Sequence, residues 1–157
     1  MSTRVTPVGG LTDEQVHSVL TAATSAPSLR NSQPWLFRAT PTVIELYADT
    51  TRAVPVADPD HRELLLACGA ALLNLRLAIR ALGVHPAVQL FPDSHQPDLL
   101  AVVRLQGRSP AGPVDRRLAE AIPHRRTNPP PVAPTTVAVP LLNGLRQAAK
   151  IEQAWMA

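Results

Sequence analysis

The sequence has few of the residues that mark disulfide-stabilised, aromatic-rich or membrane-spanning proteins. It contains one cysteine, Cys68, so no internal disulfide can form, and a reduced, cytoplasmic setting is expected. Aromatic residues make up only 3%, so the core must be built from Leu, Val, Ile and Ala. No basic start followed by an apolar run is present, so no signal peptide is expected. The most apolar stretch, Leu64–Leu73, is too short to cross a bilayer, and no membrane partner is expected.

Three kinds of binding site also lack their usual signatures. The histidines show no metal-ligand spacing, and no Gly-rich phosphate loop occurs, so no metal site is expected. Residues 101–157 hold seven Arg and one Lys against three acids, a basic excess that suits phosphate on a cofactor or on nucleic acid. No helix-turn-helix, zinc-finger or aromatic RNA-binding signature accompanies this excess, so no nucleic-acid partner is expected.

Proline, by contrast, is abundant, with 17 residues that are densest over residues 129–140. A chain of 157 residues can bury one ordinary core, and a Pro-rich stretch is typical of a linker. The sequence therefore predicts a flexible leader over 1–10, one main domain over 11–122, a linker over 123–140 and a last segment over 141–157.

The first helix has a well-defined predicted start. Thr12 as the N-cap with Gln15 three residues later forms a capping box. Leu11 and Val16 have the spacing of a hydrophobic staple. The helix is expected to end before Pro27, because the residue that precedes a proline avoids the helical region.

Four short segments have the β-branched and aliphatic composition of strands, and the first two form a predicted hairpin. These segments are Trp35–Ala39, Val43–Ala48, Val88–Phe91 and Leu100–Leu105. Shorter helices are predicted over Val114–Ile122 and Leu141–Ala154. The order helix, two strands, helix, two strands, helix predicts an α+β fold with a mixed sheet packed on a long central helix.

The long central helix is predicted over His61–Leu82. Asp60 as the N-cap and Glu63 as the returning acid suggest a second capping box, and Gly83 is a natural C-cap. This capping role accounts for these acids better than a catalytic carboxylate cluster does.

The central helix is apolar around most of its circumference, which indicates a core or interface helix. Gly69, Ala70 and Ala71 would let another backbone approach closely, so the helix is expected to be the spine of the domain, and a dimer through it is one alternative. Cys68 lies in the middle of this helix and is interpreted as a small core residue rather than a nucleophile.

The most informative stretch is the polar loop Ala26–Phe37, between the first helix and the first strand. Its prolines fix the backbone, while Ser28, Asn31 and Gln33 offer both hydrogen-bond donors and acceptors. Such a rigid loop suits the edge of a planar, hydrogen-bonding ligand. The alternative is a helix end followed by a turn, with Ser and Asn bonded to the local backbone.

The pattern Ala-Pro-Ser-x-x-Asn-x-Gln-Pro-Trp over residues 26–35 resembles the FMN-binding loop of the nitroreductase family. The wider pattern resembles the actinobacterial Acg-type proteins, in which two nitroreductase-like halves are fused. Weaker supporting stretches are 44–49 with Arg52, 58–64, 68–75 and 97–101. The resemblance covers about 12–128, which makes the main domain an N-terminal nitroreductase-like half. By this resemblance the flavin would contact Pro27, Ser28, Arg30, Asn31 and Gln33. Arg30 departs from the His expected in the fused subgroup.

A second motif, Arg125-Arg126-Thr127-Asn128, resembles a nitroreductase signature that contacts FMN phosphate and the pyrimidine end. Guanidinium groups suit phosphate because their donors form a planar fork. Pro129 stands where the family signature has its last basic residue. The alternative is a short charged turn before a linker.

The resemblance implies an FMN-binding oxidoreductase that passes a hydride from NAD(P)H to flavin and then reduces a nitro compound or a quinone. The chemistry belongs to the cofactor, so no catalytic acid or base is assigned. A fused protein would continue for about another domain, so residues 141–157 are expected to begin a truncated second half and the site to be incomplete. The partner is expected to be a second copy of the chain or a full-length relative. The alternative function is a non-catalytic half that binds flavin weakly or pairs with a full-length relative.

Overall fold

The computed structural model describes residues 9–127 and 136–156, and the chain divides into two units between Arg126 and Thr127. Residues 1–8 of the predicted leader and 128–135 of the predicted linker lie outside the described residues. The domain assignments themselves therefore stay predictions.

Helix α1 (Asp13–Thr24) begins where the sequence predicts. The Thr12 amide donates to the Gln15 side chain over 3.0 Å, and the Gln15 amide donates to Thr12 Oγ1 over 3.2 Å, so the capping box is confirmed. Leu11 and Val16, the predicted staple, are both buried.

The four strands form one sheet in the order β1-β2-β4-β3. The predicted hairpin is confirmed, because β1 (Trp35–Ala39) pairs antiparallel with β2 (Val43–Ala48). The second pair, β3 (Val84–Leu90) and β4 (Leu99–Arg108), is longer than predicted. Pro86 is accommodated within β3 because that strand lies at the edge of the sheet.

The predicted mixed sheet is wrong, because all three strand pairings among the described residues are antiparallel. The connection through the central helix does leave β2 and β3 running in the same direction. However, β4 lies between them and pairs antiparallel with both. The α+β class and the central apolar helix are confirmed.

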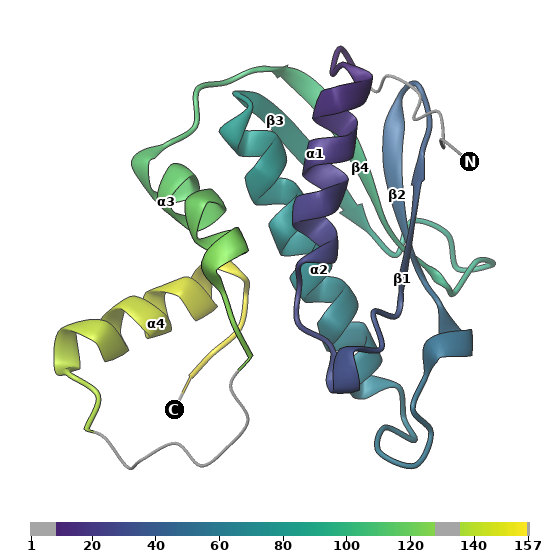
Figure 1. The fold of residues 1–157 in the computed structure, drawn as a ribbon, viewed down its shortest axis with the longest axis vertical. Helices are drawn as coiled ribbons and strands as arrows, with labels where there is room; N and C mark the ends of the chain where they lie inside the picture. Colours follow the sequence, from purple (N-terminus) through teal and green to yellow (C-terminus); the bar gives the residue numbers. More distant parts are fainter. Residues whose placement is uncertain (1–8, 128–135, 157) are drawn as a thin grey trace. The chain divides into compact units, whose positions relative to one another are not determined.

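The central helix, α2 (Arg62–Ala81), lies with α1 against one face of the sheet (Figure 1). The core between these layers contains aliphatic and small residues, with Trp35 as its one buried aromatic residue among those described. The composition therefore predicted the kind of core correctly. The buried residues of α2 are Leu64, Ala67, Cys68, Ala71, Leu72, Leu75, Leu77 and Ile79.

By length and composition alone, the 20-residue helix α2 could cross a membrane, since its mean hydropathy reaches 1.6. A core helix passes the same test. Its packing against α1, α3 and the sheet accounts for its buried apolar residues, while Leu65 and Leu66 are exposed.

Helix α3 (Pro113–Ala121) follows β4 and packs on α2. Arg80 of α2 donates from Nε and Nη2 to one oxygen of Asp115, each over 3.1 Å, which fixes α3 to the end of α2. In the second unit, α4 (Val139–Ile151) has exposed apolar side chains at Leu141, Leu145 and Ile151.

Candidate functional site

The loop between α1 and β1 has a backbone that ordinary residues avoid. Residues Leu29–Asn31 form a 3₁₀ turn, and Arg30, Asn31 and Gln33 have φ angles of 52°, 58° and 49°. This left-handed region costs Arg30 and Gln33 about 1–2 kcal/mol each, whereas Asn adopts it more readily. Such strain persists only where surrounding contacts impose it, and it clusters at functional sites.

Ser28 closes the loop on itself. Its Oγ accepts a 2.9 Å hydrogen bond from the Gln33 amide, and the Asn31 amide donates to the Ser28 carbonyl over 3.0 Å. Ser28 is therefore bonded to the local backbone, as the alternative interpretation of the loop expects, and it shapes the loop.

The far end of the loop is fixed by residues distant in sequence. Arg52 Nη1 donates to the Gln33 carbonyl over 3.3 Å, and the Asp49 amide donates to the Pro34 carbonyl over 3.0 Å. The Cys68 thiol also donates to the Pro34 carbonyl, over 3.1 Å. These contacts join the turn after β2 and helix α2 to two consecutive carbonyls of the loop.

Cys68 is confirmed as a core residue. Its side chain is fully buried, and burial raises the pKa of the thiol to about 12. A thiol that stays protonated at neutral pH is a poor nucleophile.

The side-chain amides of Asn31 and Gln33 make no hydrogen bond within the described fold. Asn31 is exposed and Gln33 half-buried, and neither side-chain amide bonds to any described residue. Arg30 and Pro27 are exposed as well. Of the predicted loop residues, Ser28 therefore bonds inward, while two amides and a guanidinium remain available to a ligand.

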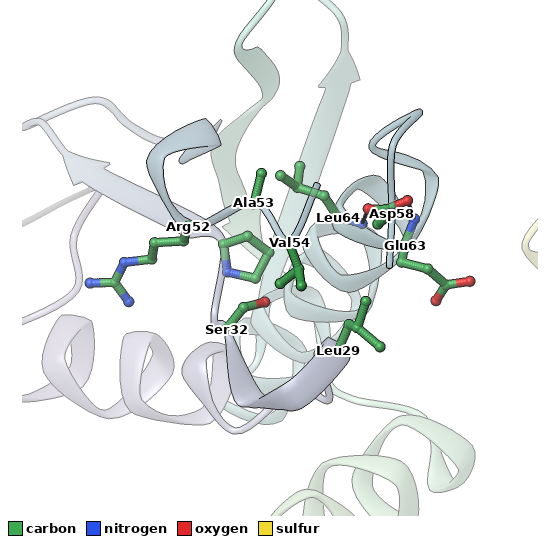
Figure 2. Close-up of a pocket in the computed structure, with 9 residues that line it drawn as sticks. Leu29, Ser32, Arg52, Ala53, Val54, Asp58, Glu63 and Leu64 are labelled. Carbon is green, nitrogen blue, oxygen red and sulfur yellow. Dashed lines mark hydrogen bonds between the residues drawn. The ribbon is translucent and has the colours of Figure 1, made fainter. Parts of the chain in front are cut away.

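The space beside this loop is small. A gap of about 10 Å³, the size of one water molecule, lies between Leu29, Ser32 and Pro34 of the loop and Val54 and Leu64 (Figure 2). Figure 2 shows that the side chains of Arg52 and Glu63 point away from the gap. A planar ligand held by this loop would therefore lie on the surface rather than in an enclosed pocket.

The amino end of α2 is capped by Asp58, and the predicted cap at Asp60 is wrong. The Asp58 carboxylate accepts hydrogen bonds from the amides of Glu63 and Leu64, over 3.0 and 2.9 Å. The left-handed backbone of His61, with φ 55°, turns the chain so that Asp58 reaches back to the first turn. Asp58 is the one buried charged side chain among the described residues.

The charge of Asp58 is stabilised by the helix it caps. Desolvation raises the pKa of Asp58, but the backbone amides of Glu63, Leu64 and Arg62 outweigh it and lower the pKa below its ordinary value. The amino end of α2 therefore already holds an anion, and it is not available to a phosphate group.

Of the second predicted motif, residues 125–128, the structure describes the first three residues. Arg125 Nη2 donates to the Ser25 carbonyl over 3.1 Å, at the carboxyl end of α1 and directly before the loop. Arg126 donates to the carbonyls of Pro123 and Arg125, over 2.7 and 2.9 Å. Thr127 belongs to the second unit, and residues 128–135 are outside the described part.

The described residues contain no cluster of three or more His, Cys, Asp or Glu side chains that could hold a metal ion. Sequence reasoning missed the supporting role of Asp49, Arg52 and Asp58. Their contacts with the loop and with α2 depend on tertiary structure, which gave no local signal in the sequence.

No protein-family model matches the chain. Two Mycobacterium tuberculosis proteins are similar to it. One, named "Putative NAD(P)H nitroreductase", is 43% identical over 115 residues, or 73% of this chain and 33% of the relative. The other, named "Putative NAD(P)H nitroreductase acg", is 36% identical over 123 residues, or 78% of this chain and 37% of the relative. The chain belongs to the nitroreductase-like family. It spans about a third of the length of these curated relatives.

The fold of this nitroreductase-like chain agrees with that assignment. The crystal structure of a "putative nitroreductase in complex with FMN" from Desulfovibrio desulfuricans superimposes with a TM-score of 0.52. The superposition covers 83% of this chain and 92% of the other, at 22% identity. At this identity the similarity shows the fold alone.

Proposed function

We propose that this nitroreductase-like chain forms one face of an FMN-binding site, with the Pro27–Gln33 loop holding the polar edge of the flavin ring. The observation that carries the proposal is the pair of unbonded amides, Asn31 and Gln33, on a backbone held in the left-handed region. A primary amide both donates and accepts hydrogen bonds. The pyrimidine edge of a flavin alternates carbonyl acceptors with an N–H donor, so the two groups are complementary.

The loop fits an edge of the ring but does not enclose it. The adjoining gap holds no more than a water molecule, so a second surface must cover the flavin. We infer that a second copy of this chain, or a longer relative, supplies this surface. Arg125, Arg126 and Thr127 are the proposed contacts for the FMN phosphate.

When bound, FMN would supply the redox chemistry, accepting a hydride from NAD(P)H and reducing a nitro compound or a quinone. The protein residues bind and orient. Asn31 and Gln33 fix the rotation of the ring within its plane, and the exposed Arg30 offers a positive charge that favours an anionic ligand edge. Ser28 acts indirectly, because its Oγ accepts a hydrogen bond from the backbone amide of Gln33.

A second function, a non-catalytic half that binds flavin weakly or pairs with a full-length relative, is favoured by one observation. The candidate site is open on one side, and the gap beside the loop holds no more than one water molecule. In either case we propose a cytoplasmic location.

The colour of the purified protein tests the proposal. We expect a yellow protein with flavin absorbance, which Asn31→Ala and Arg125→Ala should each bleach. Gln106→Ala removes an exposed amide on β4 and serves as the matched control, with colour unchanged. A colourless protein that gains no flavin absorbance from added FMN would reject the proposal that the chain is a flavin enzyme.

A yellow protein that fails to oxidise NAD(P)H in the presence of a nitro compound or a quinone would favour the non-catalytic half. Colour that forms only on mixing with a full-length relative would support that second function as well.

A further inference from the structure

The peptide groups on both sides of Gln33 are fixed by side chains. The Gln33 amide donates to Ser28 Oγ over 2.9 Å, and its carbonyl accepts from Arg52 Nη1 over 3.3 Å. With both groups bonded, φ and ψ of Gln33 cannot relax independently. The left-handed φ of 49° is thus imposed by one side chain from within the loop and one from outside it.

Arg52 is itself held in place. It ends a 3₁₀ turn, Thr50–Arg52, that Asp49 caps through the Thr51 amide. Its Nε lies 3.1 Å from Asp49 Oδ2, and the Asp49 amide donates to the neighbouring Pro34 carbonyl. Asp49 thus orients the Arg52 guanidinium and also binds Pro34, the residue that follows Gln33.

The exposure of Arg52 indicates that this residue holds the loop and does not support the core. Its side chain is 50% exposed, against 12% for Asp49, and it lies outside the buried cluster that joins the helices to the sheet. Removing the guanidinium should therefore free the loop without opening the core.

We propose that Arg52 is a positioning residue for the flavin site, which sets the direction of the Gln33 side chain by holding the Gln33 carbonyl. The inference rests on the proposed function, since it concerns the same site. In this role Arg52 acts through the backbone of the loop, by its contact with the Gln33 carbonyl. Arginine suits the role because its planar fork can reach Asp49 and Gln33 together, whereas lysine offers a single point of donation.

The test compares Arg52→Ala, Arg52→Lys and Ser28→Ala with the wild type. Arg104→Ala, which removes an exposed guanidinium from β4, is the matched control. Two quantities are measured: the FMN dissociation constant, from flavin fluorescence, and the backbone and Cβ chemical shifts of Gln33, which report its φ.

Arg52→Ala should weaken FMN binding about tenfold, the loss of one charge-assisted hydrogen bond, and move the Gln33 shifts toward extended values. Arg52→Lys should recover part of both losses, and Arg104→Ala should change neither. Ser28→Ala should act in the same direction. The double variant should lose less than the sum of the two single losses, because both side chains act on one residue.

Unchanged Gln33 shifts in Arg52→Ala would overturn the proposal, as would displaced shifts with unchanged FMN affinity. If the wild type binds no FMN, the proposed function fails. In that case, Gln33 shifts that Arg52→Ala displaces and Arg52→Lys restores still support the positioning of Gln33 by Arg52.

Discussion

At the scale of single residues, the buried acid Asp58 differs most from what the sequence suggests. Local rules favour Asp60, which has Glu63 three residues later. The structure uses Asp58 because His61 adopts a left-handed backbone and the chain doubles back. Such a path depends on how residues 50–58 pack over the loop, which no local pattern encodes.

Replacement of Asp58 by Asn should lower the melting temperature by a few degrees at pH 7, through loss of a charged cap. The folded pKa of Asp58 is depressed, so its contribution is complete above the ordinary value of 3.8 and is lost as the pH falls through the depressed value. The difference from the wild type should therefore shrink in acid. Thermal unfolding at several pH values measures it, with Asp60→Asn as the control. Equal effects at both positions would contradict the assignment.

Cys68 was correctly predicted as a core residue from its place among apolar neighbours. Its raised pKa makes a kinetic prediction: at pH 8 a thiol reagent should label the folded chain at least about a hundredfold more slowly than the chain in urea. Because the chain has one cysteine, the label reports this site alone. Rapid labelling of the folded chain would show that α2 opens locally.

At the scale of elements, strand and helix positions could be predicted well, and their arrangement less well. The bounds of β1 and β2 agree with the sequence, because alternation and turn residues are local. The mixed sheet was wrong because the insertion of β4 between β2 and β3 is decided by long-range pairing. The contacts that fix the far end of the loop were missed for the same reason, since Cys68 and Pro34 lie 34 positions apart.

Gly69 makes the prediction that belongs to α2. A Cβ built at this exposed mid-helix glycine meets no atom within 4 Å, so Gly69→Ala should stabilise the isolated chain by about 1 kcal/mol. Urea unfolding measures the gain. A loss of stability that depends on protein concentration would instead show that another backbone packs there, as the sequence led us to expect for a dimer.

At the scale of the whole molecule, the family could be identified from sequence, and an incomplete site was expected, whereas the backbone strain of the loop and the size of the adjoining gap could not be predicted. The motif gives the residue types, and the positive φ values and the water-sized gap come only from the packed structure. In the proposed site, the loop would offer a polar edge and would leave the rest of a flavin-sized ligand uncovered. Affinity should therefore depend on what covers the open side, and specificity on Asn31 and Gln33.

Direct mapping of FMN on the folded chain tests the central claim most directly. In a two-dimensional NMR titration, added FMN should shift the backbone signals of residues 28–33 and the side-chain NH₂ signals of Asn31 and Gln33. The Gln106 NH₂ signal should stay in place. An FMN titration that leaves all these loop signals unmoved, or that moves only signals of α3 and α4, would contradict the account.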